Sequence, residues 1–143
     1  MGGFVATSNV YAGYLYGIPV AGTCAHSFIM SFESEDDIKE SRMLAPKAGG
    51  EPVDLLELCI KYRTELGWNN TVMKELYAFI SFAVAYPNQF ASLVDSYNTL
   101  ESGVKNFLIC CLALTELGYT PLSIRLDSGD LADLSIKSKA LFA

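Results

Sequence analysis

Histidine, glycine-rich motifs and long apolar runs are what this sequence has least of. Its 143 residues include one histidine, one tryptophan and four cysteines, none of them in a Cys-x-x-Cys pair. A zinc site needs more ligands than this composition offers. The sequence has no Gly-x-Ser-x-Gly elbow, no P-loop and no Rossmann glycine pattern. Serine hydrolases of the elbow type and the common nucleotide-binding folds are therefore disfavoured.

Charge and hydropathy narrow the class of protein further. Charged residues make up 18% and apolar residues 51% of the chain, and the net charge is −6. An acidic chain does not hold nucleic acid by general electrostatics. The longest apolar stretches, 107–114 and 77–86, are shorter than the roughly 20 residues of a membrane span. We therefore expect no nucleic-acid partner and no membrane span.

The cysteines and the amino terminus indicate the compartment. All four cysteines lie in apolar runs, which is typical of reduced core thiols rather than of a disulfide framework. The first 30 residues lack the basic region of a secretory signal peptide. We therefore expect a cytoplasmic chain with reduced cysteines.

Apolar spacing and capping residues predict five helices. Their expected ranges are about 10–16, 52–66, 72–86, 104–117 and 131–142. The helices over 72–86 and 104–117 are apolar on nearly every side, which predicts burial within a larger body. The acidic segment 33–51 is expected to be a solvated loop or a short exposed helix.

Two further segments read as strands, which together with the helices predicts an α/β fold with parallel strands. Residues 18–25 are small or branched, and His26 follows them directly. Residues 121–126 form the second expected strand, with Arg125 and Asp127 on one face and Ser128 beyond its end.

Ligands of α/β folds bind where parallel strands end, so these polar residues are site candidates. Arginine recognises carboxylate or phosphate in bidentate fashion, and a histidine can act as acid, base or nucleophile. The turn at Gly129 and the helix start after it can hold an anion. Two other interpretations stay open. His26 can be a structural histidine, and Arg125 can pair with Asp127 or with another part of the protein.

Several blocks of sequence resemble the nicotinate phosphoribosyltransferases. They are Thr7-Ser8-Asn9-Val10, 17–27, Asp95-Ser96-Tyr97-Asn98, 102–107 and 125–131. Met43-Leu44-Ala45-Pro46 resembles an insertion of the animal form. The similarity is collinear over essentially the whole chain.

The resemblance implies an activity. Such an enzyme joins nicotinate to 5-phosphoribosyl 1-pyrophosphate (PRPP), forming nicotinate mononucleotide and pyrophosphate, the first step of NAD synthesis from nicotinate. Family members couple this reaction to ATP hydrolysis through a phosphohistidine, and His26 matches that position. Mg²⁺ is expected with ATP and PRPP, with no metal ligated by this chain itself and no tightly bound organic cofactor.

The resemblance also assigns roles to other residues. Thr23 and Arg125 match residues that hold nicotinate, and Asp127 would face the ribose or the positive charge that develops at its anomeric carbon. The remaining substrate-binding candidates are Ser8, Asn9, Ser128 and Gly129.

Fold and assembly follow from the same resemblance. The family combines an N-terminal domain with an irregular α/β barrel of the type II phosphoribosyltransferase kind, and its active site forms between two subunits. Residues 1–143 would be the central part of that barrel domain, with two parallel barrel strands and surrounding helices. The N-terminal domain and the C-terminal part of the barrel would be absent. We therefore expect the isolated segment to be inactive and poorly folded.

Two alternatives to this function remain. The first is a nicotinamide-specific relative, which the Gly-Thr-x-Ala-His-Ser and Arg-Leu-Asp-Ser-Gly-Asp-Leu sequences disfavour. The second is a non-catalytic truncated chain that associates with full-length subunits.

Overall fold

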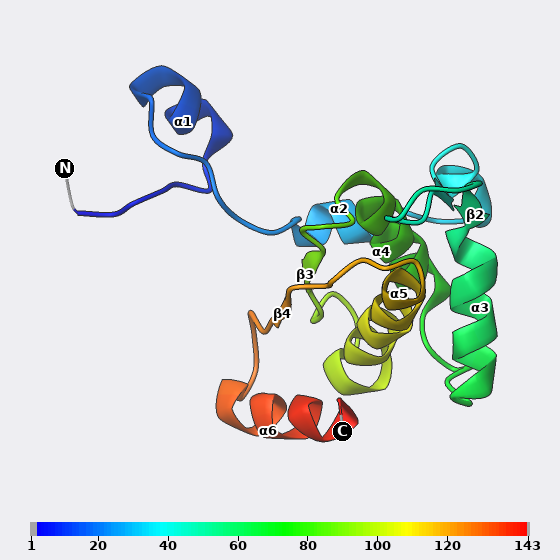
Figure 1. The fold of residues 1–143 in the computed structure, drawn as a ribbon. Helices are drawn as coiled ribbons and strands as arrows, with labels where there is room; N and C mark the ends of the chain where they lie inside the picture. Colours follow the sequence, from blue (N-terminus) through cyan, green and yellow to red (C-terminus); the bar gives the residue numbers. More distant parts are fainter. Residues whose placement is uncertain (1–2, 143) are drawn as a thin grey trace.

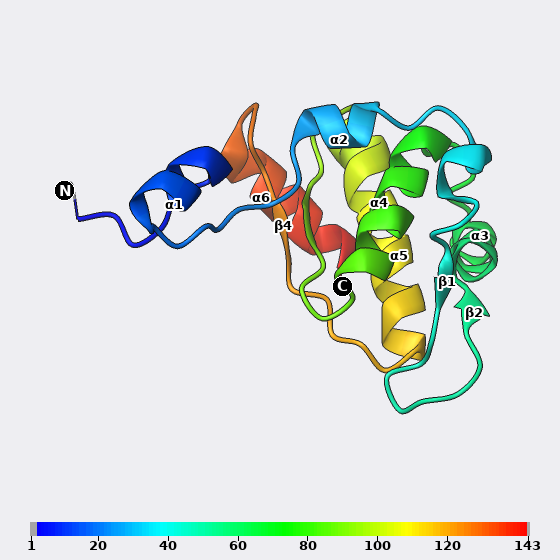
Figure 2. The same ribbon diagram turned by 90° about the horizontal axis from the view of Figure 1, so that it is seen from above.

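A computed structural model describes residues 3–142 (Figure 1). They form a helical body, residues 26–142, and an amino-terminal arm, residues 3–25. The arm carries helix α1 (Val10–Tyr16), as predicted. The Asn9 side chain caps the helix by accepting a hydrogen bond from the Ala12 amide, and Gly17 ends it with a left-handed φ of 62°. Figure 1 shows α1 standing apart from the other helices, and Figure 2 shows the same molecule from above.

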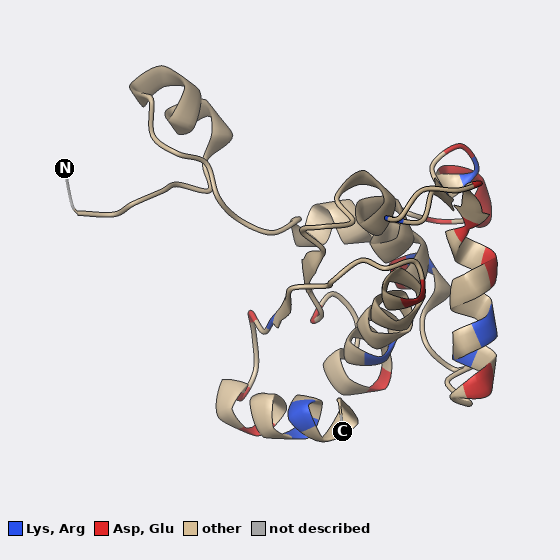
Figure 3. Ribbon diagram, viewed as in Figure 1, with Lys and Arg blue, Asp and Glu red and all other residues tan. Residues whose placement is uncertain are grey.

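The arm is apolar and uncharged. No Lys, Arg, Asp or Glu occurs before Glu33, and Figure 3 shows the acidic and basic positions of the ribbon confined to the body. Tyr14 and Tyr16 of α1 are largely exposed.

Three helices form the core of the body. They are α3 (Leu55–Glu65), α4 (Met73–Ala85) and α5 (Val104–Glu116), and they pack on one another. Phe79, Phe90 and Ile109 are fully buried among them. Helix α6 (Leu131–Leu141) follows the second strand and packs beside α5. The predicted helices over 72–86, 104–117 and 131–142 are thus confirmed to within two residues at each end.

Two local expectations need correction. Helix α3 begins at Leu55 and not at Pro52, because the Asp54 carboxylate caps it by accepting from the amides of Leu56 and Glu57. Residues 53–54 form strand β2 (Val53–Asp54), antiparallel to β1 (Met43–Leu44). The acidic segment contains the 3₁₀ turn η1 (Glu35–Ile38), whose Ile38 is fully buried against the core.

The α/β class is confirmed, but one of the two expected strands is wrong. Strand β4 (Ser123–Arg125) lies within the predicted segment 121–126, and its parallel partner is β3 (Ala91–Leu93) rather than residues 18–25. Residues 18–25 are extended but mostly exposed, and their one bridge joins Val20 to Thr7. An extended segment becomes a strand only when a neighbour takes its backbone hydrogen bonds, and β3 takes this place beside β4.

Within residues 3–142 the parallel sheet has two strands, so the barrel that the resemblance implies is not confirmed. None of the described helices is both long and apolar enough to cross a membrane. All four cysteines are free, as expected, and Cys59 and Cys110 are fully buried.

A buried polar cluster lies where α4 meets α5. It contains Glu75 of α4, Ser102 and Asn106, which are at most 3% exposed. The Ser102 hydroxyl donates to Glu75 Oε2 at 2.5 Å, and Asn106 Nδ2 donates to the same oxygen at 3.0 Å. Loss of water around the carboxyl raises the pKa of Glu75 from 4.5 to about 7, and the two hydrogen bonds oppose that rise.

This raised pKa predicts a pH-dependent stability. Between pH 4.5 and 7 the unfolded chain releases the Glu75 proton while the folded chain keeps it. The free energy of unfolding is therefore expected to fall by about 3 kcal/mol across this window and to level off above pH 7. Glu75→Gln should remove that part of the pH dependence of the unfolding free energy. Urea titrations of the wild-type protein and of the variant at pH 5 and pH 8 would measure the difference. Equal slopes in the two proteins would contradict the prediction.

Candidate functional site

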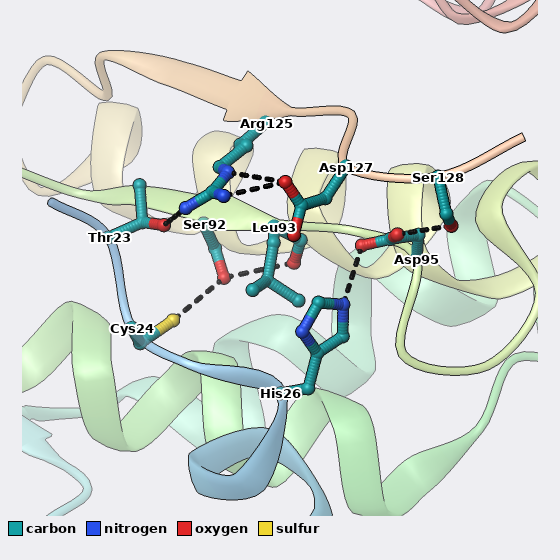
Figure 4. Close-up of polar contacts among 9 residues, drawn as sticks. All are labelled: Thr23, Cys24, His26, Ser92, Leu93, Asp95, Arg125, Asp127 and Ser128. Carbon is teal, nitrogen blue, oxygen red and sulfur yellow. Dashed lines mark hydrogen bonds and ion pairs between the residues drawn. The ribbon is translucent and has the colours of Figure 1, made fainter. Parts of the chain in front are cut away.

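The site candidates gather where the two parallel strands end (Figure 4). In the register of the sheet Leu93 lies opposite Arg125, so the segments that follow β3 and β4 leave the sheet side by side. Asp95 follows β3 by two residues, and Asp127 follows β4 by the same interval. The rule that ligands of α/β folds bind at the carboxyl ends of strands therefore applies here, with β3 in the place expected for residues 18–25.

His26 reaches this edge from another element. It was expected at the end of a strand, but it is the first residue of helix α2 (His26–Met30), directly after the extended segment. Its Nε2 lies 3.1 Å from Asp95 Oδ1. The Asp95 side chain is 3% exposed, whereas that of His26 is 41% exposed. One edge of the imidazole is therefore held by a buried carboxyl group while the rest faces solvent.

Ser128 completes this first cluster. Its hydroxyl donates to Asp95 Oδ2 at 2.5 Å, so the two carboxyl oxygens of Asp95 hold side chains from two separate segments. In the His26 tautomer that carries its hydrogen on Nε2, this nitrogen donates to an ionised Asp95, and Nδ1 is the ring nitrogen with a free lone pair.

The second cluster is centred on Arg125. Its Nε and Nη2 atoms both donate to Asp127 Oδ1, at 3.0 and 2.6 Å. Its Nη1 lies 3.4 Å from Thr23 Oγ1, on the extended segment. The Arg125–Asp127 pair is one of the interpretations that the sequence left open, and it forms here. The pairing occupies the Nε–Nη2 edge of the guanidinium group, and the Arg125 side chain stays half exposed beside Thr23.

A third contact fixes the extended segment against the sheet. Cys24 Sγ lies 3.2 Å from the hydroxyl of Ser92, which is fully buried in β3. Because Cys24 stands between Thr23 and His26, this contact helps to place both candidates over the strand ends. A groove of about 620 Å³ opens beside Thr23 and is lined mainly by apolar side chains, among them Phe82, Tyr86 and Leu122.

The remaining predicted residues lie outside the two clusters. Asn9 uses its side chain to cap α1, and Ser8 lies beside Gly22 on the arm. Gly129 adopts a φ of 82° in the turn before α6, a conformation that favours glycine. The structure thus brings together Thr23, His26, Arg125, Asp127 and Ser128.

Asp95 is the site residue that the sequence analysis missed. It occurs in one of the quoted blocks, yet no role was assigned to it. The signal was present, since an apolar run, 90–94, stands between Pro87-Asn88 and an acidic residue. Such a run bounded by turn residues is typical of a buried strand, and its end is where a functional carboxylate is expected.

Within residues 3–142 no three His, Cys, Asp or Glu side chains are grouped closely enough to hold a metal ion. The carboxylates of Asp95 and Asp127 are engaged by His26, Ser128 and Arg125. At this edge Arg125 is a cation that can pair with an anionic ligand, and the two carboxylates can accept hydrogen bonds from hydroxyl groups.

Comparison with known proteins tests the resemblance. No family model matches the chain. The nicotinate phosphoribosyltransferase of Dictyostelium discoideum is 46% identical over 142 residues, which are 99% of this chain and 24% of that protein. The enzymes of Caenorhabditis elegans and Homo sapiens are 44% and 43% identical over 99% of this chain.

The same relationship holds for the fold. The crystal structure of human nicotinic acid phosphoribosyltransferase superposes with a TM-score of 0.81 at 42% identity, covering 99% of this chain and 29% of that one. The resemblance is therefore confirmed. In sequence and in fold the chain matches a segment of the nicotinate phosphoribosyltransferases, and this segment makes up about a quarter of their length.

Proposed function

We propose that this chain is part of an enzyme that transfers the phosphoribosyl group of PRPP to nicotinate, forming nicotinate mononucleotide and pyrophosphate. The observation that carries the proposal is the convergence of His26, Asp95, Arg125 and Asp127 on one edge of a parallel sheet, in a chain 41–46% identical to such enzymes. Arg125 supplies a cation for a carboxylate, and His26 supplies a nucleophile.

His26 is the proposed site of phosphorylation by ATP. Its Nδ1 lone pair would attack the γ-phosphorus, the bond to the β–γ bridging oxygen would break, and ADP would leave with that electron pair. Asp95 would accept a hydrogen bond from Nε2, 3.1 Å away, and so favour the tautomer with the free lone pair on Nδ1. The resulting phosphoramidate stores free energy of hydrolysis, and its negative charge can help to hold pyrophosphate and Mg²⁺ in the site.

Arg125 and Thr23 are the proposed nicotinate ligands. The Asp127 pairing restrains the guanidinium group, so less side-chain entropy is lost when a carboxylate or a pyridine ring binds against it. Asp127 would lie next to the ribose, where a carboxylate stabilises the positive charge that develops at the anomeric carbon. The other substrate-binding candidates are still Ser8, Asn9, Ser128 and Gly129.

The wider setting belongs to the same proposal. Mg²⁺ would enter with the phosphates of ATP and PRPP, and no tightly bound organic cofactor is required. The net charge of −6 disfavours nucleic acid as a partner. Four free thiols suit the cytoplasm. The complete enzyme would be a homodimer, for which the exposed aromatic residues of α1 offer contact surface.

Turnover by the complete protein tests the function. Incubation with PRPP, Mg²⁺, ATP and nicotinate should yield nicotinate mononucleotide and pyrophosphate, measured by chromatography, and nicotinamide should yield far less product. Preferential turnover of nicotinamide would support the nicotinamide-specific alternative. Residues 1–143 alone should yield no nucleotide. If residues 1–143 bind full-length subunits in sedimentation and add no activity to them, the non-catalytic alternative holds for the truncated chain.

A further inference from the structure

The buried cluster of Glu75, Ser102 and Asn106 has no part in the proposed chemistry, yet it is connected to the site. Glu75 Oε1 and Asn106 Oδ1 are both buried, and neither has a hydrogen-bond partner among the described residues. A carboxyl group that keeps its proton can donate one hydrogen bond, which ionised carboxylates cannot. Ser102 and Asn106 are the hydrogen-bond partners of Glu75. Cys110 is a buried titratable group whose charge interacts with that of Glu75, and burial strongly raises its pKa.

Ser102 belongs to a π-helical turn, η2 (Thr99–Gly103), that leads into α5. Such turns are uncommon and occur often at functional sites. The Ser102 hydroxyl, besides donating to Glu75, accepts from the Val72 amide at 3.0 Å. Asn106 Nδ2 also donates to the Val72 carbonyl at 2.9 Å. The cluster therefore ties η2 and α5 to the start of α4.

The same turn packs directly against the end of β3. A Cβ atom on Gly103 would lie 1.9 Å from the Val94 carbonyl oxygen, so the two backbones are in contact. Val94 is followed by Asp95, which holds His26 and Ser128. On the far side of the short loop, the Asn98 carbonyl accepts from the amides of Ser102 and Gly103 at 2.9 and 3.0 Å. The segment between β3 and η2, residues 94–98, is the Asp95 loop, and both of its ends thus rest on η2.

We propose that Glu75 is a positioning residue for His26: it anchors η2 on α4, η2 fixes the Asp95 loop, and Asp95 orients the imidazole. The proposal rests on the proposed function insofar as His26 is phosphorylated. The position of the loop can be measured without that reaction.

The test compares Glu75→Gln and Glu75→Leu in the complete protein. Gln keeps a neutral hydrogen-bonding group of the same length. Leu is of similar size and removes both hydrogen bonds of the Glu75 side chain, while the bonds of Ser102 and Asn106 to Val72 remain. Hydrogen exchange of peptides covering 95–103 should accelerate in Glu75→Leu and stay unchanged in Glu75→Gln. The rate of His26 phosphorylation by ATP should fall about tenfold in Glu75→Leu and stay within about twofold in Glu75→Gln.

A double-mutant cycle with Asp95→Asn separates an effect of Glu75 through Asp95 from a general loss of stability. If Glu75 acts through Asp95, adding Glu75→Leu to Asp95→Asn should lower the phosphorylation rate little further. Multiplicative effects of the two substitutions would overturn the proposal. Glu101→Gln, on the exposed side of the same turn, keeps a hydrogen-bond acceptor for Lys105; it is the matched control and should change neither readout.

Other outcomes are equally decisive. Unchanged exchange of residues 95–103 in Glu75→Leu would overturn the proposal. If Glu75→Leu does not fold, Ser102→Ala removes the Ser102 hydrogen bonds to Glu75, Val72 and Asn106 and should give a loss in the same direction, while wild-type behaviour would overturn the proposal. A wild-type protein without phosphate on His26 would refute the phosphorylation step alone, because the exchange measurement still tests the anchor.

Discussion

His26→Ala is expected to abolish phosphate uptake from ATP by the complete protein. The substitution removes the nucleophilic nitrogen and leaves α2 intact, because Ala25 and not His26 occupies the position that caps this helix. Acid-labile phosphate, measured with γ-labelled ATP and located by peptide mass spectrometry, should fall to background. Stimulation of nicotinate mononucleotide synthesis by ATP should be lost, with a rate reduction of roughly 10²-fold or more.

Ser27→Ala is the matched control for this variant. Ser27 is the next residue of the same helix, is exposed, and has no assigned role in the proposed reaction. It should take up phosphate like the wild-type protein. Labelled phosphate that persists in His26→Ala would place the phosphorylated group elsewhere and would remove the proposed role of Asp95 as well.

The sequence predicted the helices well because their signals are local. The apolar runs over 72–86 and 104–117 lie in α4 and α5, and α1 ends before the left-handed Gly17, as the expected range 10–16 predicts. The start of α3 was predicted wrongly at Pro52, because proline is also favoured in the first turn of a helix. The structure uses the Asp54 side chain as the cap and leaves Pro52 outside.

Strand pairing could not be read from the sequence in the same way. Residues 18–25 have the composition of a buried strand, whereas β3 is only three residues long and pairs with residues 32 positions further along the chain. Which of the two segments lies beside β4 depends on packing against the helices. The same dependence explains why Asp95 was missed, because its contact with His26 joins residues 69 positions apart.

Gly103→Ala is expected to destabilise the protein even though alanine favours helices. The backbone φ of Gly103 is −57°, which any residue can adopt, so helix propensity alone predicts a gain of roughly 1 kcal/mol. The added Cβ atom would lie 1.9 Å from the Val94 carbonyl oxygen, however, and backbone atoms cannot move aside as a side chain can. We expect a loss of about 3 kcal/mol, measured as a lower urea midpoint, with accelerated hydrogen exchange at Asp95.

Gly22→Ala supplies the steric control, since its Cβ atom would meet Ser8 Cβ at an ordinary 3.6 Å. Stability should then change by less than about 0.5 kcal/mol. The sign of the Gly103→Ala effect is decisive, because helix propensity and steric overlap predict opposite changes. A stabilised Gly103→Ala protein would show that η2 does not rest on Val94. The route from Glu75 through η2 to Asp95 and His26 would then lose its middle contact, whereas a destabilised protein with a loosened Asp95 loop would support the step from η2 to Asp95.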